Sequence, residues 1–398
     1  MPVIALVFGF LVSLVAALIL VPATRRLALR AGWVDAPDGH RKVHARAVPN
    51  VGGVAIVGAA CVGIGVMTVA RFQLPRTISG ALTLPDPLVV LGALLIAAVG
   101  FWDDLREISH RTKFAGQLVV TALAFLGGAR VEVFDGPLGG GALALAVSAA
   151  LTVVWMVGMM NAVNLIDGMD GLAAGVVAIA FAGLAAAHAV RGDIGALVLA
   201  VAVGGSLLGF LRYNFNPASI FMGDSGSLFL GYALAAYALR GTTHPNPVLA
   251  LVIPAVIMGI PVLDTGVSIL RRKLTGKPLF HADRDHIHHR LQSQMSTPRA
   301  ALTLYGFGAF LAAGAVAMAG MGVGVAFLTF LAGTAVVYAF LCYVRYLPTP
   351  ASVARFLSRR RKLRQLLDAR VGGAADARAP RAGRIAHDRF EPVAGPER

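Results

Sequence analysis

Apolar stretches of about twenty residues recur along this chain from residue 3 to residue 343, and they constrain its fold more than any other feature. About twenty apolar residues in a helix are enough to cross the hydrocarbon core of a bilayer. Hydrophobic residues make up 57% of the 398 residues and charged residues only 14%, against roughly 25% charged in a soluble domain. The pattern therefore predicts an all-α integral membrane protein.

The stretches predict about eleven transmembrane helices. They cover residues 3–21, 52–70, 87–101, 114–128, 142–160, 172–190, 194–211, 228–239 and 248–270, followed by 301–343, which divides into two at residues 320–322. Pro254 and Pro261 predict a kink in the ninth stretch, because proline cannot donate the backbone hydrogen bond of a regular helix.

Lysine and arginine predict the orientation, because cytoplasmic loops are enriched in these two residues. If the segment after the first stretch is cytoplasmic, the inner segments hold 30 of the 35 basic residues and the outer segments hold 5. The N-terminus is then outside and the C-terminus is inside. The polar motifs described below all fall on the cytoplasmic side in this arrangement.

The chain divides into a membrane domain, residues 1–344, and a basic tail, residues 345–398. Apolar residues of the tail follow helical spacing among five basic residues between 359 and 364, which suits a helix on anionic inner-leaflet lipids. A solvated helix end fits that spacing equally well, and the composition from residue 372 onward is typical of disorder. The net charge of +15 comes without a soluble basic domain, so we expect no nucleic-acid partner.

Four polar motifs lie at the predicted cytoplasmic ends of the apolar stretches. They are Asp103-Asp104, the series Asn161, Asn164, Asp167 and Asp170, the turn around Asp224, and the loop containing Asp285, His286, His288, His289 and Arg290. Charged groups beside hydrocarbon are costly, so each is a candidate functional residue. Two acids at a helix C-terminus oppose the helix dipole, which favours function over an ordinary helix end for Asp103 and Asp104.

The Asn and Asp series favours a divalent cation or substrate hydroxyl groups as its ligand. Four residues spaced by three cannot share one face of a regular helix, and Gly168 and Gly171 predict a break where the backbone approaches a ligand. Asp224 has two interpretations. It is either the N-cap of the next helix or a ligand of magnesium, which prefers one or two carboxylates together with substrate phosphates. Asn164 or Asp167 would then be its protein partner.

The histidine loop suits a pyrophosphate, because histidine and arginine donate hydrogen bonds to anionic oxygens. Lys42, His44 and Arg46 lie in another basic loop, where phosphate binding and plain positive-inside charge explain the residues equally well. Lys113 either extends its ammonium group to the membrane interface or holds a lipid phosphate. Asp264 is expected first as an ion-pair partner within its helix and second as a site residue.

Taken in order, these motifs resemble the polyprenyl-phosphate N-acetylhexosamine-1-phosphate transferases of glycosyltransferase family 4. The resemblance covers residues 3–343 and rests on RKVH at 41–44 with PNVGG at 49–53, DD at 103–104, NAVNLIDGMDGL at 161–172, FMGDSGS at 221–227 and ADRDHIHHRL at 282–291. The last motif is similar to that of the branch that transfers N-acetylglucosamine 1-phosphate to undecaprenyl phosphate or a related lipid. Ile166 stands where the peptidoglycan branch usually has threonine.

The resemblance implies a reaction and its partners. The enzyme would transfer a sugar 1-phosphate from a UDP-aminosugar to a polyprenyl phosphate, giving a polyprenyl-diphosphate-sugar and UMP. It would use Mg²⁺, or Mn²⁺ as a substitute, in a bacterial-type plasma membrane with the active site facing the cytoplasm. The reaction would be the first membrane step of a cell-envelope glycopolymer pathway, and a homodimer is left open.

The resemblance also implies roles for individual residues. Asp224 with Asn164 would hold magnesium, and Asp103 and Asp104 would engage the lipid phosphate near Lys113, with Asp103 also a candidate general base. Asp167 and Asp170 would line the nucleotide–sugar pocket. The remaining substrate-binding candidates are Lys42, His44, Arg46, Asn161, Gly168, Asp285, His286, His288, His289 and Arg290.

Two alternative functions stay open from the sequence. One is the phospho-N-acetylmuramoyl-pentapeptide transferase of peptidoglycan synthesis, which belongs to the same family. The other is a secondary transporter for an anionic solute, in which polar groups lie near the middle of the membrane and often in matched halves. Here the polar groups gather at one face and the two halves of the chain show no evident match.

Overall fold

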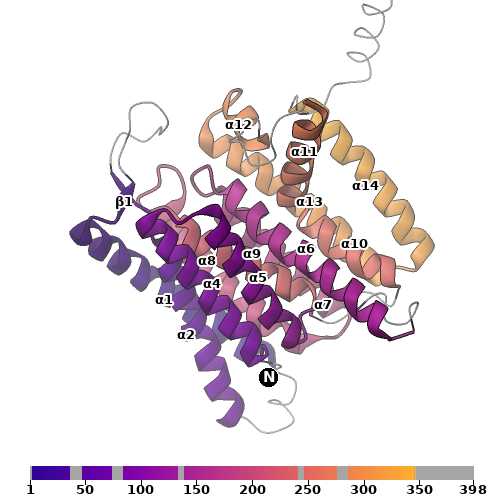
Figure 1. Ribbon diagram of the computed structural model, residues 1–398, viewed down its shortest axis with the longest axis horizontal. Helices are drawn as coiled ribbons and strands as arrows, with labels where there is room; N and C mark the ends of the chain where they lie inside the picture. The colour runs from indigo at the N-terminus through magenta and orange to yellow at the C-terminus, as the bar shows by residue number, and fades with distance from the viewer. Residues whose placement is uncertain are drawn as a thin grey trace, which may run out of the picture. The chain divides into compact units, whose positions relative to one another are not determined.

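The structure is a computed structural model that describes residues 2–35, 47–73, 84–132, 139–240, 246–275, 286–344 and 346. The chain has two compact units, Met1–Phe340 and Leu341–Arg398, and nearly all described residues belong to the first. The helices and strands are α1 (Pro2–Ala31), β1 (Val34–Asp35), β2 (Val48–Pro49), α2 (Gly52–Gln73), α4 (Pro87–Arg106), α5 (His110–Leu126), α6 (Ala142–Ile166), α7 (Leu172–Val190), η1 (Ile194–Ala196), α8 (Leu197–Asn214), α9 (Gly223–Ala238), α10 (Pro247–Ile257), α11 (Gly259–Thr275), α12 (Ile287–Gln292), α13 (Thr297–Gly320) and α14 (Val323–Tyr343) (Figure 1).

Eight helices in the described part of the chain are long and apolar enough to cross a membrane: α1, α2, α4, α6, α7, α8 together with η1, α13 and α14. The pair α10 and α11 meets the same criteria only when taken together. Helices α5 and α9 occupy two further apolar stretches but have only 17 and 16 residues. The protein is therefore a mostly helical integral membrane protein. The expected all-helical fold has one exception, because β1 and β2 form a short antiparallel pair.

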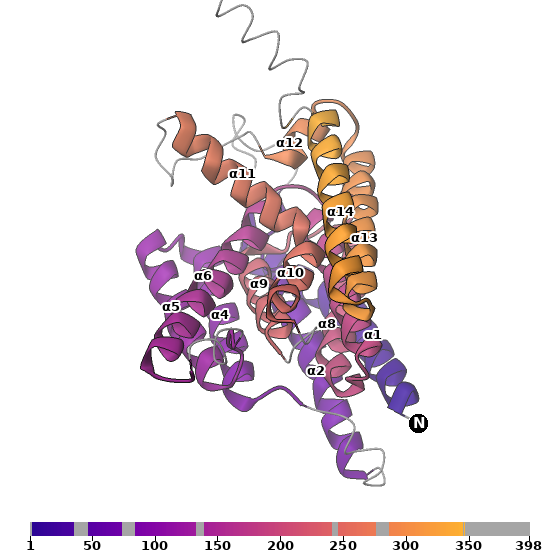
Figure 2. The same cartoon turned by 90° about the vertical axis from the view of Figure 1, so that its right-hand side faces the viewer.

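The two prolines of the ninth stretch do lie beside a sharp change of direction, as predicted. Helix α10 contains Pro254 and α11 contains Pro261, and the two helices are bent by 92° at the break between Ile257 and Gly259. Figure 2 shows α11 leaving the end of α10 at this steep angle. The bend matters for function because α11 carries Asp264, which contacts the histidine cluster.

Helices α4 and α5 form a hairpin that brings two candidate residues together. Glu107 ends α4 with a positive φ of 45°, and Ser109 begins α5 by accepting a hydrogen bond from the backbone N–H of Thr112 at 3.2 Å. Such a left-handed residue ends a helix, and a serine N-cap begins the next one. Asp103 near the end of α4 and Lys113 near the start of α5 consequently lie at the same end of the hairpin.

Helix α9 is the most enclosed helix of the first unit, since every residue from Ser225 to Ala238 is buried. It packs mainly against α4 and α6, and also against α2. Small residues permit this close approach, because a side chain added at Gly231 would meet the Cα atom of Met160 at 2.6 Å, and one added at Gly100 would strike the backbone of Asp224. The close packing fixes the position of Asp224 at the N-terminal end of α9.

Candidate active site

The start of α9 is held by Asp104, which lies on another helix. Oδ1 of Asp104 accepts the backbone N–H of Asp224 at 2.6 Å, and Oδ2 accepts the backbone N–H of Ser225 at 3.0 Å. These are two of the first N–H groups of α9, which have no carbonyl partner within their own helix. Asp104 therefore caps α9 from α4, and its two carboxyl oxygens lie at the positive end of that helix.

Residues 49–53 hold the segment before α9 through their backbone. Gly52 and Gly53 donate hydrogen bonds to the carbonyl oxygens of Phe221 and Met222 at 2.9 and 2.8 Å, and Phe221 donates to the carbonyl of Pro49 at 2.8 Å. A side chain at Gly53 would collide with the backbone around Gly226. This part of the PNVGG motif thus positions the turn that carries Asp224.

The side chain of Asp224 does not cap its own helix, because Asp104 takes that role. Its Oδ1 accepts a hydrogen bond from Nδ2 of Asn164 at 2.7 Å, and its Oδ2 pairs with the ammonium group of Lys113. Lys113 also pairs with Asp103. Asn164 makes a second bond, to Oγ of Ser227 at 2.9 Å. Of the two interpretations of Asp224, the geometry favours a ligand-binding carboxylate over an N-cap.

Four helix ends thus meet around a group that we call the acidic cluster: Asp103, Asp104, Asp167 and Asp224 with Asn164 and Lys113. Burial, followed by the charges of Asp224, Asp104 and Asp170, raises the pKa of Asp167 well above its ordinary value. Among the described residues, the ion pairs that reach these four carboxylates come from Lys113. The cluster therefore has four carboxyl groups and one cation, and this crowding of acidic groups contributes to the raised pKa of Asp167.

Asp170, the last residue of the series, lies in a different set of contacts. Its Oδ2 accepts hydrogen bonds from Nδ2 of Asn216 at 2.9 Å and from the backbone N–H of Ala218 at 3.0 Å. Asn214 accepts the N–H of Gly171 at 3.1 Å. Asp170 thus joins the turn after α6 to the loop after α8. Asn214 and Asn216 are not among the residues predicted from the sequence, although two asparagines at the end of an apolar stretch are a signal in it.

The histidines of α12 form a second group, which we call the histidine cluster: His286, His288 and His289. The ring centroids of His288 and His289 are 4.2 Å apart, and those of His286 and His288 are 5.7 Å apart. A side chain added at Gly168 would come within 2.9 Å of Nε2 of His288, so the turn after α6 touches this cluster. Burial, followed by the charge of His289, lowers the pKa of His288 to about 3, so this ring is neutral at pH 7.

Asp264 of α11 orients the first of these histidines. Oδ2 of Asp264 lies 2.9 Å from Nδ1 of His286, and Oδ1 accepts the backbone N–H of Ile287 at 2.8 Å. Both side chains are buried, with 1% of Asp264 and 4% of His286 exposed. A carboxylate on Nδ1 fixes the tautomer of an imidazole and leaves Nε2 to face its ligand. Asp264 therefore holds His286 and the start of α12 in place, and its role as a site residue stays a prediction.

The remaining candidates divide into two groups. Asn161 donates to Oε1 of Gln117 at 3.0 Å, and so links α6 to α5 one turn away from Asn164. Arg290 follows His289 on α12. Lys42, His44, Arg46 and Asp285 lie outside the residues that the structure describes.

The acidic cluster fits a magnesium ion of the kind that also binds substrate. No group of three or more His, Cys, Asp or Glu side chains in the described part of the chain forms a complete metal cage. Magnesium prefers a site with one or two carboxylates and the oxygens of phosphate groups. Asp224 offers a carboxylate and Asn164 an amide oxygen, within a cluster of four carboxyl groups and one lysine.

Asp104 gives a first test of this geometry. Replacing Asp104 by alanine removes both bonds to α9 and is expected to lower the free energy of unfolding by about 1–2 kcal/mol, as the loss of an N-cap does. Asp104→Asn retains one acceptor, so its free energy of unfolding should lie between those of the wild type and of Asp104→Ala. The unfolding temperature should decrease, and the magnesium concentration needed for half-maximal activity should increase in the same variants. Lost activity at an unchanged unfolding temperature would instead assign Asp104 to the substrate.

Asp167 gives a second test, through its raised pKa. Above the ordinary pKa of about 4 for an aspartate, the folded state binds more protons than the unfolded state. The stability of the metal-free protein should therefore decrease as the pH rises from there. Asp167→Asn should be more stable than the wild type without magnesium at neutral pH. Melting curves from pH 5 to 8 would check this, and equal pH dependence of the two proteins would contradict it.

The chain has clear relatives among known proteins. The sequence profile of glycosyl transferase family 4 matches residues 87–242. A Bacillus subtilis protein named probable undecaprenyl-phosphate N-acetylglucosaminyl 1-phosphate transferase is 39% identical over 294 residues, which cover 73% of this chain and 78% of the relative. The decaprenyl-phosphate N-acetylglucosaminephosphotransferase of Mycolicibacterium smegmatis is 36% identical, with coverage of 77% and 80%.

A phospho-N-acetylmuramoyl-pentapeptide-transferase of Geobacillus kaustophilus is also similar, at 33% identity over 73% of this chain and 89% of that protein. The helical membrane fold, the polar groups at one set of helix ends and these similarities define a membrane-embedded transferase. The chain belongs to glycosyl transferase family 4. The predicted resemblance to this family is thus confirmed.

Proposed function

We propose that this protein transfers N-acetylglucosamine 1-phosphate from UDP-N-acetylglucosamine to a polyprenyl phosphate, releasing UMP. The observation that carries the proposal is the meeting of Asp103, Lys113, Asn164 and Asp224 at one point, beside the histidine cluster. Relatives named as N-acetylglucosamine phosphotransferases are 39% and 36% identical, and one from the pentapeptide branch is 33% identical. The higher identity to the N-acetylglucosamine phosphotransferases supports N-acetylglucosamine as the sugar of the donor.

The reaction is a displacement at phosphorus. The lipid phosphate has a second pKa of about 6, so it is a dianion at neutral pH and needs no base to attack. One of its oxygens forms a bond to the phosphorus that bears the sugar, while the bond from that phosphorus to the UMP oxygen breaks. A magnesium ion held by Asp224 and Asn164 would supply neutralisation of charge on the phosphate oxygens.

The protein side chains position the two anionic substrates. Lys113 lies between Asp103 and Asp224 and supplies the positive charge for the attacking lipid phosphate. Asp264 holds Nδ1 of His286, and its carboxylate would stabilise a ring that donates from Nε2 to the diphosphate of the donor. His288 is neutral, so it contributes a hydrogen bond rather than a positive charge. Asp104 acts through Asp224, because its two bonds go to the backbone of α9.

We further propose that the chain crosses the membrane eleven times and that the acidic cluster faces the cytoplasm. Helices α5 and α9 and the bent pair of α10 and α11 would join the eight longer helices to give eleven crossings. The excess of basic residues in alternate segments places the acidic cluster on the cytoplasmic side, where UDP-sugars are made. The orientation is tested by placing a cysteine at Glu107, directly after α4, and treating cells with a thiol reagent that does not cross the membrane. This cysteine is expected to react only after the cells are permeabilised.

The proposed function is tested by incubating the purified protein with a polyprenyl phosphate, magnesium and one UDP-sugar at a time. UMP release should be fastest with UDP-N-acetylglucosamine and negligible with UDP-N-acetylmuramoyl-pentapeptide. The reverse order would assign the chain to the pentapeptide branch. Uptake of a nucleotide sugar into proteoliposomes without UMP release would favour the transporter instead.

A further inference from the structure

A pocket of about 300 Å³ lies at the opposite end of α4 from the acidic cluster. The start of α4, the end of α5, the first part of α8 and the end of α9 form its walls. Asp86 and Asp103 mark the two ends of α4, a helix of 20 residues that is about 30 Å long. The pocket is therefore separate from the proposed active site and lies where these helices reach the other interface of the membrane.

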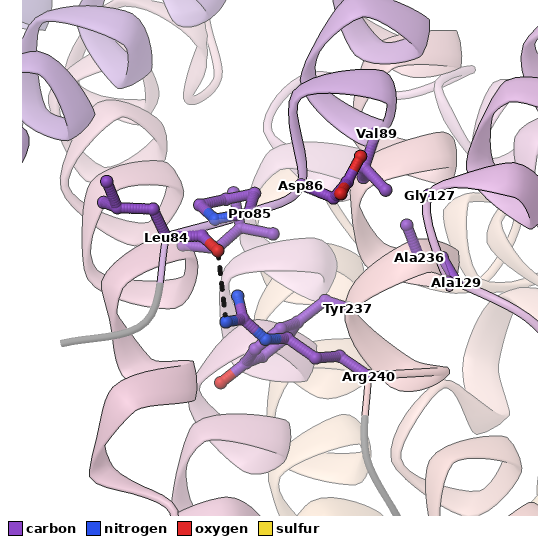
Figure 3. A pocket seen from close by; sticks show the side chains of 11 residues that line it. Leu84, Pro85, Asp86, Val89, Gly127, Ala129, Ala236, Tyr237 and Arg240 are labelled. Atoms are coloured by element: carbon purple, nitrogen blue, oxygen red, sulfur yellow. Dashed lines mark hydrogen bonds between the residues drawn. The ribbon is translucent and has the colours of Figure 1, made fainter. Parts of the chain in front are cut away.

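The walls of the pocket are mostly apolar, with three polar groups among them. Leu84, Gly127 and Leu199 are typical of the apolar part, and Asp86, Tyr237 and Arg240 supply the polar groups. Figure 3 shows the guanidinium group of Arg240 next to the ring of Tyr237, with the carboxylate of Asp86 at another part of the wall. A mostly apolar cavity with a few polar groups is the usual form of a small-molecule site.

Two buried polar atoms at this end of the helices indicate a ligand. Only 1% of Tyr237 is exposed, and its hydroxyl has no hydrogen-bond partner in the described part of the chain. The ring centroid of His188 is 5.1 Å from that of Tyr237, and Nε2 of His188 also has no hydrogen-bond partner in the described part of the chain. Leaving one such group unsatisfied costs about 1–3 kcal/mol, so the hydroxyl of Tyr237, a residue that lines the cavity, is unusual.

The polar groups of the pocket indicate which kind of ligand would bind there. A guanidinium group and a phenol both donate hydrogen bonds to phosphate oxygens. Asp86 caps α4 by accepting the N–H of Leu88 at 2.8 Å, which leaves its other oxygen for a cation. Phospholipid phosphates lie at this depth, just outside the hydrocarbon core. The volume fits a head group without its acyl chains.

We propose that this pocket binds the head group of a zwitterionic phospholipid. Arg240 and Tyr237 hold the phosphate, and Asp86 holds the ammonium group. Phosphatidylethanolamine has both charges, whereas phosphatidylglycerol and inorganic phosphate lack the ammonium group. The pocket is far from the acidic cluster, so its test does not depend on the transferase reaction.

The test is thermal unfolding of the full-length protein in detergent, titrated with each of the three compounds. Phosphatidylethanolamine should raise the unfolding temperature of the wild type more than phosphatidylglycerol does, and inorganic phosphate should have little effect. Arg240→Gln should need about tenfold more lipid for the same effect, as the loss of one charged hydrogen bond predicts. Arg191→Gln is the matched control, because this exposed arginine lies at the same end of the helices but outside the pocket.

Two conservative variants keep the test decisive if Arg240→Gln fails to fold. Tyr237→Phe removes only a hydroxyl that has no partner among the described residues, so it should fold at least as stably and respond severalfold less to the lipid. Asp86→Asn keeps the N-cap and should abolish the preference for phosphatidylethanolamine. Unchanged responses in both variants would overturn the proposal and leave a cavity filled by water. An equal response of the wild type to inorganic phosphate would make it a free-anion site instead.

Discussion

Asp224→Asn is expected to lower kcat/KM for UMP release by about a thousandfold, the range seen when one electrostatic contact to a transition state is removed. The substitution keeps the volume of the side chain but removes the charge that pairs with Lys113 and would hold magnesium. The free energy of unfolding should change little, because Asp104 still caps α9 through the backbone N–H groups.

The measurement is UMP release across a magnesium titration. The variant should stay inactive at magnesium concentrations that saturate the wild type. Glu132→Gln is the control, since it makes the same carboxylate-to-amide change at a side chain that is 55% exposed and lies outside the acidic cluster, and it should retain full activity. Activity of Asp224→Asn within threefold of the wild type would contradict the assigned role.

Substitution of Asp264 should give the second large effect on activity. Two substitutions separate its contribution to stability from its contribution to the His286 ring. Asp264→Ala leaves the N–H of Ile287 without its acceptor in a buried place and leaves Nδ1 of His286 only the more distant Oγ of Ser268 at 3.4 Å, which should cost about 3 kcal/mol of stability. Asp264→Asn can still accept from Ile287, but its amide group presents a donor to Nδ1. The variant therefore loses the negative charge that lies beside Nδ1 of His286.

Asp264→Asn should therefore fold but lose about a hundredfold in kcat/KM, because His286 loses the carboxylate that would stabilise its ring while Nε2 donates to the diphosphate of the donor. A double-mutant cycle with His286→Ala is the control. If Asp264 acts through His286, the effects of Asp264→Asn and His286→Ala should not add. Fully additive effects would mean that Asp264 contributes to activity by another route.

The sequence was sufficient for the helical membrane fold and for the sharp bend near Pro254, because apolar length and proline chemistry act locally. It was less informative about α5 and α9, which are shorter than an ordinary crossing. A helix of this length gives a weak hydropathy signal, although α9 is the most enclosed helix of the first unit.

Sequence reasoning also found most residues of the acidic cluster but could not assign their partners. Asp104 caps a helix that begins 119 positions later along the chain, and no local pattern reports such a contact. The same is true of Asp264 and His286, which are 22 residues apart. The Asn161 to Asp170 series looked like one unit, but the turn after α6 directs Asn164 and Asp170 to different partners.

The central claim is that a sugar and its phosphate move together onto the lipid. The most direct measurement uses UDP-N-acetylglucosamine labelled with radioactive phosphorus in the phosphate next to the sugar, with magnesium and a polyprenyl phosphate. We predict that the label enters the organic phase with the lipid and that unlabelled UMP remains in water. Sugar transfer with the label retained in water-soluble UDP would contradict the claim, because the bond broken would then lie between sugar and phosphate.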